Sequence, residues 1–164
     1  MNNQLFQLTF PDDAWKETTV YTFEGPHDSG VQHNLVLTID TSVPKDVLLK
    51  DYAQGQHEVT TRLLPGYEFV DEKEKTMSSG VPVYEITYKY VPADEVVLFQ
   101  KQLFMFIEKK AYVFTSTFNK KTLNTIANEV EEIVGSLKTG GMEWWSGGVV
   151  RRGVGEIGVL ENGK

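Results

Sequence analysis

The sequence contains no cysteine, and histidine is scarce, with three in 164 residues. Without cysteine the chain cannot build a thiolate metal site, a redox motif or a cysteine nucleophile, and the absence fits a reducing cytoplasm. His27, His33 and His57 lack the spacing of a helical metal-binding motif such as HExxH, so we expect them at the surface or in loops. No metal ion and no other cofactor is therefore predicted.

Clustered positive charge and long apolar runs are also missing. The 16 lysines and arginines are scattered among 23 acidic residues, and the net charge of −7 disfavours binding to nucleic acid or to an anionic membrane. The longest apolar stretch, residues 96–107, is interrupted by Gln100, Lys101 and Gln102. No stretch approaches the ~20 apolar residues of a membrane helix, and residues 1–4 do not resemble a signal peptide. We expect a soluble, cytoplasmic protein without a membrane anchor.

Recognisable catalytic motifs are absent as well. Ser29 and Ser146 do not lie in a G-x-S-x-G turn, and the glycine pairs near the C-terminus lack the following Gly-Lys-Ser/Thr of a phosphate loop. An unrecognised carboxylate site formed by Asp12, Asp13 and Glu85 is the remaining enzymatic alternative. The sequence therefore favours a protein that is not an enzyme.

The pattern of apolar residues predicts strands, a helix, more strands and a final helix. Alternation indicates strands over residues 5–10, 18–23, 33–40, 67–77, 83–91, 95–108 and 111–118. A first helix is expected between Ser42 and Pro65, and a second after Asn119. The apolar residues at helical spacing in the first helix, which would face the core, are Leu48, Tyr52, Val59 and Leu63. The apolar stripe of the second helix would comprise Leu123, Ile126, Ala127, Val130, Ile133, Val134 and Leu137. This order predicts an α+β fold, an antiparallel β-sheet with helices packed on one face.

The composition changes near residue 140. Residues 1–139 are expected to form one α+β domain, and residues 140–164 form a glycine-rich C-terminal tail that contains Trp144 and Trp145. Two structures of this tail stay open. It is either disordered or an extra hairpin held in place by the two tryptophans.

The strands carry an unusual second set of side chains. A sheet face in open water usually carries lysine and glutamate, whereas here valine, threonine and glutamine alternate with the apolar residues. Threonine and valine are good strand formers, which is one explanation. The other explanation is that this face binds an apolar partner.

Several short segments, taken in order, resemble one protein family. Residues 11–17, 19–23, 50–56, 64–67, 100–104 and 111–115 are similar to the DcrB-like Eag chaperones of bacterial type VI secretion, and the resemblance covers about residues 4–138. It implies a PsbP/Mog1-like fold and a cytoplasmic homodimer. It also implies a chaperone that shields the apolar N-terminal helices of PAAR-containing effectors before the effector is loaded onto the VgrG spike.

The resemblance also assigns residues to client binding. Val20 and Thr22 match strand positions that face the client, and Gln56 and Gln102 match glutamines that hydrogen-bond to it. Thr22 departs from the family pattern, because a larger aliphatic residue is typical at that position. A PsbP/Mog1-like protein-binding module with a different partner is the alternative function.

Overall fold

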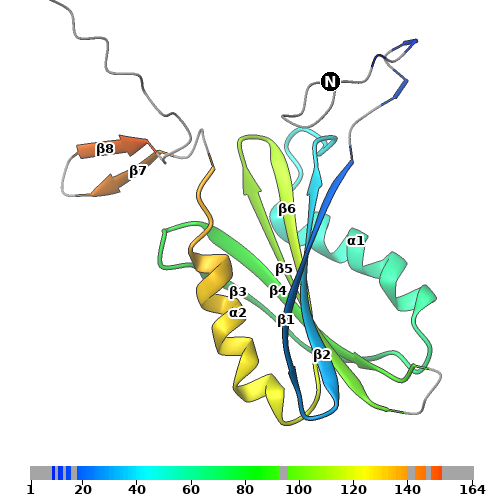
Figure 1. Cartoon of the computed structure of the whole chain (residues 1–164). Helices are drawn as coiled ribbons and strands as arrows, with labels where there is room; N and C mark the ends of the chain where they lie inside the picture. Colours follow the sequence, from blue (N-terminus) through cyan, green and yellow to red (C-terminus); the bar gives the residue numbers. More distant parts are fainter. Residues whose placement is uncertain are drawn as a thin grey trace, which may run out of the picture.

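The main body of the protein is a six-stranded antiparallel β-sheet with two α-helices (Figure 1). This computed structural model describes residues 9, 11–12, 14–15, 18–92 and 96–139, and the backbone of residues 143–146 and 149–152. The strands of the sheet are β1 (Thr19–Asp28), β2 (Val31–Asp40), β3 (Glu68–Thr76), β4 (Pro82–Tyr90), β5 (Leu98–Ile107) and β6 (Lys110–Phe118). The helices are α1 (Leu49–Leu63), a short 3₁₀ helix η1 (Thr122–Asn124) and α2 (Ile126–Gly135).

The strand order in the sheet is β1-β2-β6-β5-β4-β3. Strands β3 to β6 follow one another as a meander, so their pairing uses short connections. The β1–β2 hairpin joins this meander through a single ladder between β2 and β6. The predicted antiparallel α+β fold is confirmed, because every ladder of the sheet is antiparallel.

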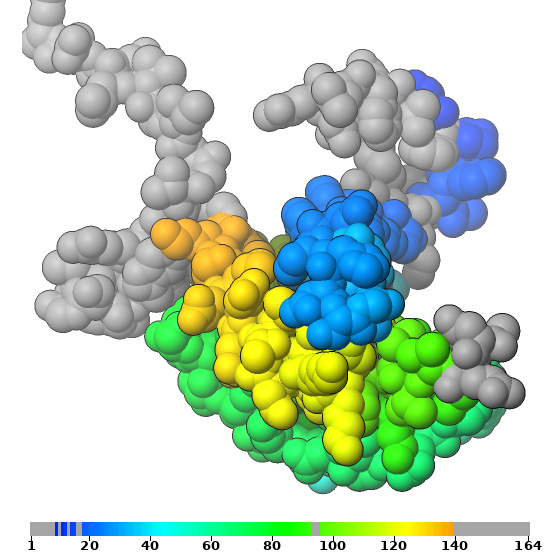
Figure 2. Space-filling model, turned by 60° about the horizontal axis from the view of Figure 1, so that its bottom comes forward, coloured from blue at the N-terminus to red at the C-terminus, as the bar shows by residue number. Residues whose placement is uncertain are grey.

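The prediction that both helices pack on one face of the sheet is wrong. Helix α2 covers one face, called here the α2 face, where the buried apolar residues of the strands are Leu35, Leu37, Val83, Leu103, Met105, Ile107, Phe114 and Phe118. Helix α1 packs on the opposite face, called here the α1 face, where they are Tyr84, Ile86, Tyr88, Phe104 and Ala111. Both registers of β4 and β5 carry apolar side chains, so each face supports its own core. Figure 2 shows α2 in yellow beside the blue β1–β2 hairpin.

The amphipathic pattern of α2 is largely confirmed. Ile126, Ala127, Val130 and Val134 are buried, whereas Ile133 is 55% exposed. Asn119 does not begin α2, because its side-chain oxygen accepts hydrogen bonds from the backbone N–H groups of residues 121 and 122. This arrangement caps η1, and α2 starts seven residues after Asn119.

Helix α1 begins later than predicted and buries a different stripe. Its first residue is Leu49, because Ser42 forms a turn by donating its backbone N–H and hydroxyl to the carboxylate of Asp40. The buried residues are Tyr52, Ala53 and His57. Val59 and Leu63, expected to lie in the core, are 59% and 74% exposed. The helix therefore presents apolar side chains to solvent.

Two further strands lie near the C-terminal end of the described chain. Strands β7 (Glu143–Ser146) and β8 (Val149–Arg152) pair with each other as a separate two-stranded sheet. The expected role of the two tryptophans in holding a hairpin in place stays a prediction. The strand predicted over residues 5–10 lies outside the described residues, apart from residue 9.

Candidate functional site

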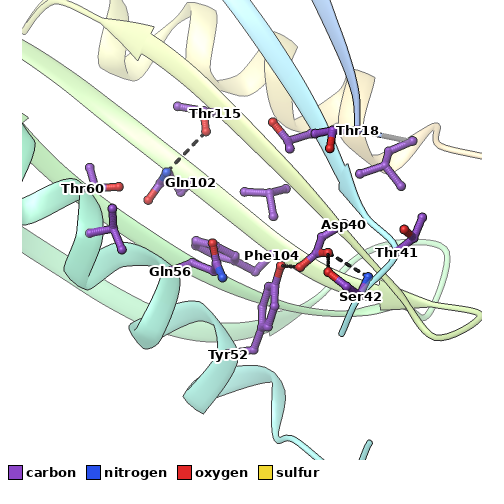
Figure 3. A pocket seen from close by; sticks show the side chains of 14 residues that line it. Thr18, Asp40, Thr41, Ser42, Tyr52, Gln56, Thr60, Gln102, Phe104 and Thr115 are labelled. Carbon is purple, nitrogen blue, oxygen red and sulfur yellow. Dashed lines mark hydrogen bonds between the residues drawn. The ribbon is translucent and has the colours of Figure 1, made fainter. Parts of the chain in front are cut away.

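A groove on the α1 face runs between helix α1 and the strands β2, β5 and β6, and Thr18, just before β1, also lines it (Figure 3). Its volume is about 460 Å³. Hydroxyl, amide and apolar side chains line it, together with one carboxylate. The lining residues are Thr18, Thr38, Ile39, Asp40, Thr41, Ser42, Tyr52, Gln56, Val59, Thr60, Gln102, Phe104, Val113 and Thr115.

The groove exists because α1 covers only part of its face. The helix packs on β4 and β5, where Tyr52 and Ala53 meet Phe104 and the tyrosines of β4. Strands β6, β2 and β1 continue the sheet beyond the helix. Their side chains on this face are small, since Val113 and Thr115 of β6 are followed by Thr38 and Val36 of β2. Small side chains beside a helix leave a channel between the helix and the far edge of the sheet.

Strand β1 extends this face to the edge of the sheet. Val20 pairs with Thr38, and Thr22 pairs with Val36, so both β1 residues lie on the same face as the groove. Val20 is 54% exposed, and Thr22 is exposed too. Gln56 and Gln102 line the groove itself. The structure therefore brings the four residues selected from the sequence to one face of the protein, and their role in binding stays a prediction.

Gln102 is held in place by a buried histidine. Its side-chain oxygen lies 3.0 Å from Nδ1 of His57, and Nε2 of His57 lies 2.7 Å from the hydroxyl of Tyr67. With the hydroxyl of Tyr67 donating to Nε2, Nδ1–H of the neutral ring donates to Gln102. The amide nitrogen of Gln102 lies 3.5 Å from the hydroxyl of Thr115. This chain of hydrogen bonds fixes the orientation of the Gln102 amide in the groove.

The expectation that the histidines lie at the surface or in loops is wrong for two of them. His57 is 7% exposed, and His33 is 2% exposed, with its ring bonded to Thr122 and to the backbone oxygen of Pro26. His27 is exposed, in strand β1 beside a bulge. A histidine can be buried at low cost where both ring nitrogens have hydrogen-bond partners.

Replacing Gln102 by leucine is expected to lower the free energy of unfolding by about 1–3 kcal/mol, because Nδ1 of buried His57 loses its partner. Gln56→Leu is the matched control. Gln56 is exposed and makes no side-chain hydrogen bond within the described part of the chain, so its change should stay within about 0.5 kcal/mol. Urea unfolding measures both variants. Equal effects would contradict the positioning role of His57.

One end of the groove is acidic. One carboxylate oxygen of Asp40 accepts the backbone N–H and the hydroxyl of Ser42, at 2.8 and 2.7 Å, and the other accepts the hydroxyl of Tyr52 at 2.8 Å. Burial, the hydrogen bond to Asp40 and its negative charge together raise the pKa of Tyr52. The tyrosine therefore stays a hydrogen-bond donor to Asp40 in the neutral pH range.

Sequence reasoning missed two groove residues on α1, Val59 and Thr60. The signal was present in part, because Tyr52, Val59 and Leu63 lie at helical spacing, whereas Thr60 was not singled out. Residues 52, 56, 59, 60 and 63 lie along one side of α1. The structure shows it to be the helix wall of the groove, continued by exposed Leu63.

Two carboxylates of the enzymatic alternative, Glu85 and Asp12, have other partners. Glu85 is buried on the α2 face beside the amines of Lys75, Lys73 and Lys101, at 2.6, 3.4 and 3.8 Å. Asp12 accepts the backbone N–H of Ala14, and Asp13 lies outside the described residues. In the described part of the chain, no group of three or more His, Asp or Glu side chains could hold a metal ion. None of the described helices is long and apolar enough to cross a membrane.

The sheet, its two helices on opposite faces and the groove beside α1 define a small α+β domain of a known kind. The chain belongs to the DcrB family, whose model matches residues 7–136. The sequence-based assignment to a DcrB-like family is thereby confirmed. No match was found among curated proteins.

Two solved structures are similar to this chain. The first is the crystal structure of a protein of unknown function from Pseudomonas aeruginosa, with a TM-score of 0.65 and 19% sequence identity, and the match covers 85% of this chain and 94% of that one. It supports the fold. The second is the solution structure of cyanobacterial PsbP from Synechocystis sp. PCC 6803, with a TM-score of 0.48 and 16% identity, covering 71% of this chain and 79% of that one.

Proposed function

We propose that this protein is a cytoplasmic chaperone that binds apolar N-terminal helices of PAAR-containing type VI secretion effectors in the groove and keeps them soluble. The observation that carries the proposal is the groove itself, flanked by Val20 on β1 and Val59 on α1, both more than half exposed. Membership of the DcrB family and the resemblance to Eag chaperones support it. In this proposal the protein contacts the VgrG spike only through the effector that it has bound, and it releases the helices of the effector after loading.

The chemistry of the groove suits an apolar helix. Membrane helices associate through close packing of small side chains and through hydrogen bonds between helices, rather than through the hydrophobic effect alone. The groove offers small Val113 and Thr115 for packing, and the amides of Gln56 and Gln102 for hydrogen bonds. A lining of this mixture can replace the contacts that a neighbouring membrane helix would give.

The size of the groove bears on the oligomeric state. A 20-residue helix about 30 Å long and 10 Å wide occupies on the order of 2,000 Å³. The groove, at about 460 Å³, takes in only one side of such a helix. A second copy of the protein would cover more of the client, and we therefore include a homodimer in the proposal.

The test is co-expression of this protein with the apolar N-terminal segment of a PAAR-containing effector from the same genome. We expect a soluble complex that co-purifies, with two copies of this chain by light scattering. A segment that aggregates equally with and without this protein would contradict the chaperone role for that client. The function as a protein-binding module with another partner would then be the better explanation.

Two substitutions, one on α1 and one on α2, test on which face of the protein the client binds. Val59→Asp is expected to reduce the co-purified client at least about tenfold, because an apolar helix in the groove would bury the new carboxylate without a partner. Ile133→Asp is the matched control, since Ile133 is similarly exposed but lies on α2 at the opposite face. Equal loss in both variants, or loss in neither, would contradict binding in the groove.

A further inference from the structure

The two edge strands of the sheet differ in charge. At one edge, β3 carries five consecutive charged residues, 71–75, and charged side chains of this kind keep a sheet edge from pairing with another molecule. At the other edge, residues 20–23 of β1 are all uncharged. Within the described part of the chain, no strand pairs with the outer side of β1. One edge of the sheet is therefore protected by charge, and the other is not.

Apolar side chains are exposed on both faces of the uncharged edge. Val20, Tyr21 and Phe23 are 54%, 49% and 53% exposed. Val20 lies on the α1 face. Tyr21 and Phe23 pair with the buried residues Leu37 and Leu35, so they lie on the α2 face. An uncharged edge with exposed apolar side chains is typical of a strand that pairs with a strand of another molecule.

A bulge limits the length of this edge. The register between β1 and β2 shifts between Glu24 and His27, and Pro26 has no backbone N–H to donate. Regular pairing beyond residue 24 is therefore interrupted. A short uncharged strip suits a second copy of the same chain, because two molecules of net charge −7 repel each other where their charged surfaces meet.

Pairing of two copies through this strip has a defined geometry. Two identical strands paired antiparallel in one sheet are related by a two-fold axis perpendicular to the sheet. With the axis at Tyr21, Val20 of one copy lies opposite Thr22 of the second copy, on the same face. The axis keeps each face of the sheet on its own side. The open strands β6, β2 and β1 of both copies then lie side by side between two α1 helices.

We propose that two copies of the protein pair through β1, so that Val20 and Thr22 lie at the centre of a combined groove rather than at its rim. The inference rests on the proposed function, since it names the interface of the homodimer that would hold the client. The groove of one copy, at about 460 Å³, takes in only one side of an apolar helix. The second copy adds its own strands to the floor and its own α1 as the opposite wall.

The absence of cysteine makes this interface testable by disulfide formation. In Tyr21→Cys the only two cysteines of a dimer would face each other, and opposed residues of an antiparallel pair have Cα atoms about 4.5–5.5 Å apart, within the range of a disulfide. We expect most of the full-length variant to become a covalent dimer under mild oxidation, without any client. Phe69→Cys is the matched control, because Phe69 is 50% exposed on β3 at the opposite edge, and it should stay monomeric on a reducing-agent-free gel.

Charged variants test the same contact without a covalent bond. In Tyr21→Lys two ammonium groups would face each other, and the dissociation constant of the dimer should rise at least about tenfold by light scattering on dilution. Phe69→Lys adds the same charge at the other edge and should leave the dimer unchanged. Mixing Tyr21→Lys with Tyr21→Glu should restore the dimer, because opposite charges then face each other. Circular dichroism of each variant checks that the fold is kept.

The outcomes separate the interface from the proposed function, because these tests use no client. A monomeric wild-type protein, or a dimer that Tyr21→Lys leaves intact, overturns the inference. Equal covalent dimer in Tyr21→Cys and Phe69→Cys assigns the disulfide to random collision and also overturns it. A dimer that pairs through β1 but captures no client in the co-expression experiment upholds the interface and contradicts the proposed function.

Discussion

Replacing Glu85 by alanine is expected to lower the free energy of unfolding by about 3 kcal/mol, which guanidinium unfolding would measure. Glu85 is 3% exposed and accepts a hydrogen bond from Lys75 at 2.6 Å, and Lys75 also contacts Glu131 of α2 at 2.9 Å. Its removal leaves the Lys75 ammonium short of a partner. Lys73 and Lys101 can turn toward solvent. The expected loss of unfolding free energy is therefore at the low end of the range for a broken buried ion pair. A loss below about 1 kcal/mol would contradict this account.

The same carboxylate predicts the pH dependence of stability. Burial alone would raise the pKa of Glu85, but the hydrogen bond from Lys75 and the charges of Lys101, Lys75 and Lys73 outweigh it and hold the pKa below 4.5. Because the folded pKa is lower than the unfolded one, the contribution is complete above about pH 4.5 and is lost as the pH falls through the folded value. Glu85→Gln should therefore show a flatter stability profile below pH 4.5 than wild type. Equal slopes of stability against pH in the variant and the wild type would contradict a lowered pKa of Glu85.

Phe104→Ala should be the most damaging substitution in the floor of the groove. Phe104 is 1% exposed, lines the groove, and packs edge-on against Tyr52 with ring centroids 6.5 Å apart. Loss of the ring is expected to cost about 3–5 kcal/mol, because it leaves a cavity between the sheet and α1. Chemical denaturation at pH 7 measures the loss.

Phe69→Ala is the control for this substitution. Phe69 lies in β3 at the other edge of the sheet and is 50% exposed, so its removal should cost less than about 1 kcal/mol. A similar loss in both variants would show that the cost reflects strand propensity rather than the packing of α1. A Phe104→Ala protein with near wild-type stability would contradict the assignment of Phe104 to the core.

Much of the fold was predictable because each element carries its own periodicity. The strands of the meander alternate clearly, and the stripe containing Ile126, Val130 and Val134 identified α2. The side of the sheet on which each helix lies was not predictable. It depends on how the chain crosses the sheet between β2 and β3 and after β6, which no local pattern records.

Helix α1 shows why the candidate site was only partly predictable. Val59 and Leu63, at helical spacing from Tyr52, suggested the buried stripe. The actual stripe contains Ala53 and His57 instead, because Gln102 and Tyr67 satisfy the histidine ring from other parts of the chain. Such partners are 45 and 10 residues away in sequence, so periodicity alone could not show them.

The single ladder between β2 and β6 has a consequence for the order of assembly. The meander from β3 to β6 forms from neighbouring segments, whereas β2 must find a partner more than 70 residues further along the chain. Long-range pairing of this kind closes late, because a large loop must be ordered first. We therefore expect the β1–β2 part of the sheet to be completed last. Before it docks, the α1 face would lack the β2 side of the groove, so under the proposed function client capture would follow folding of the protein.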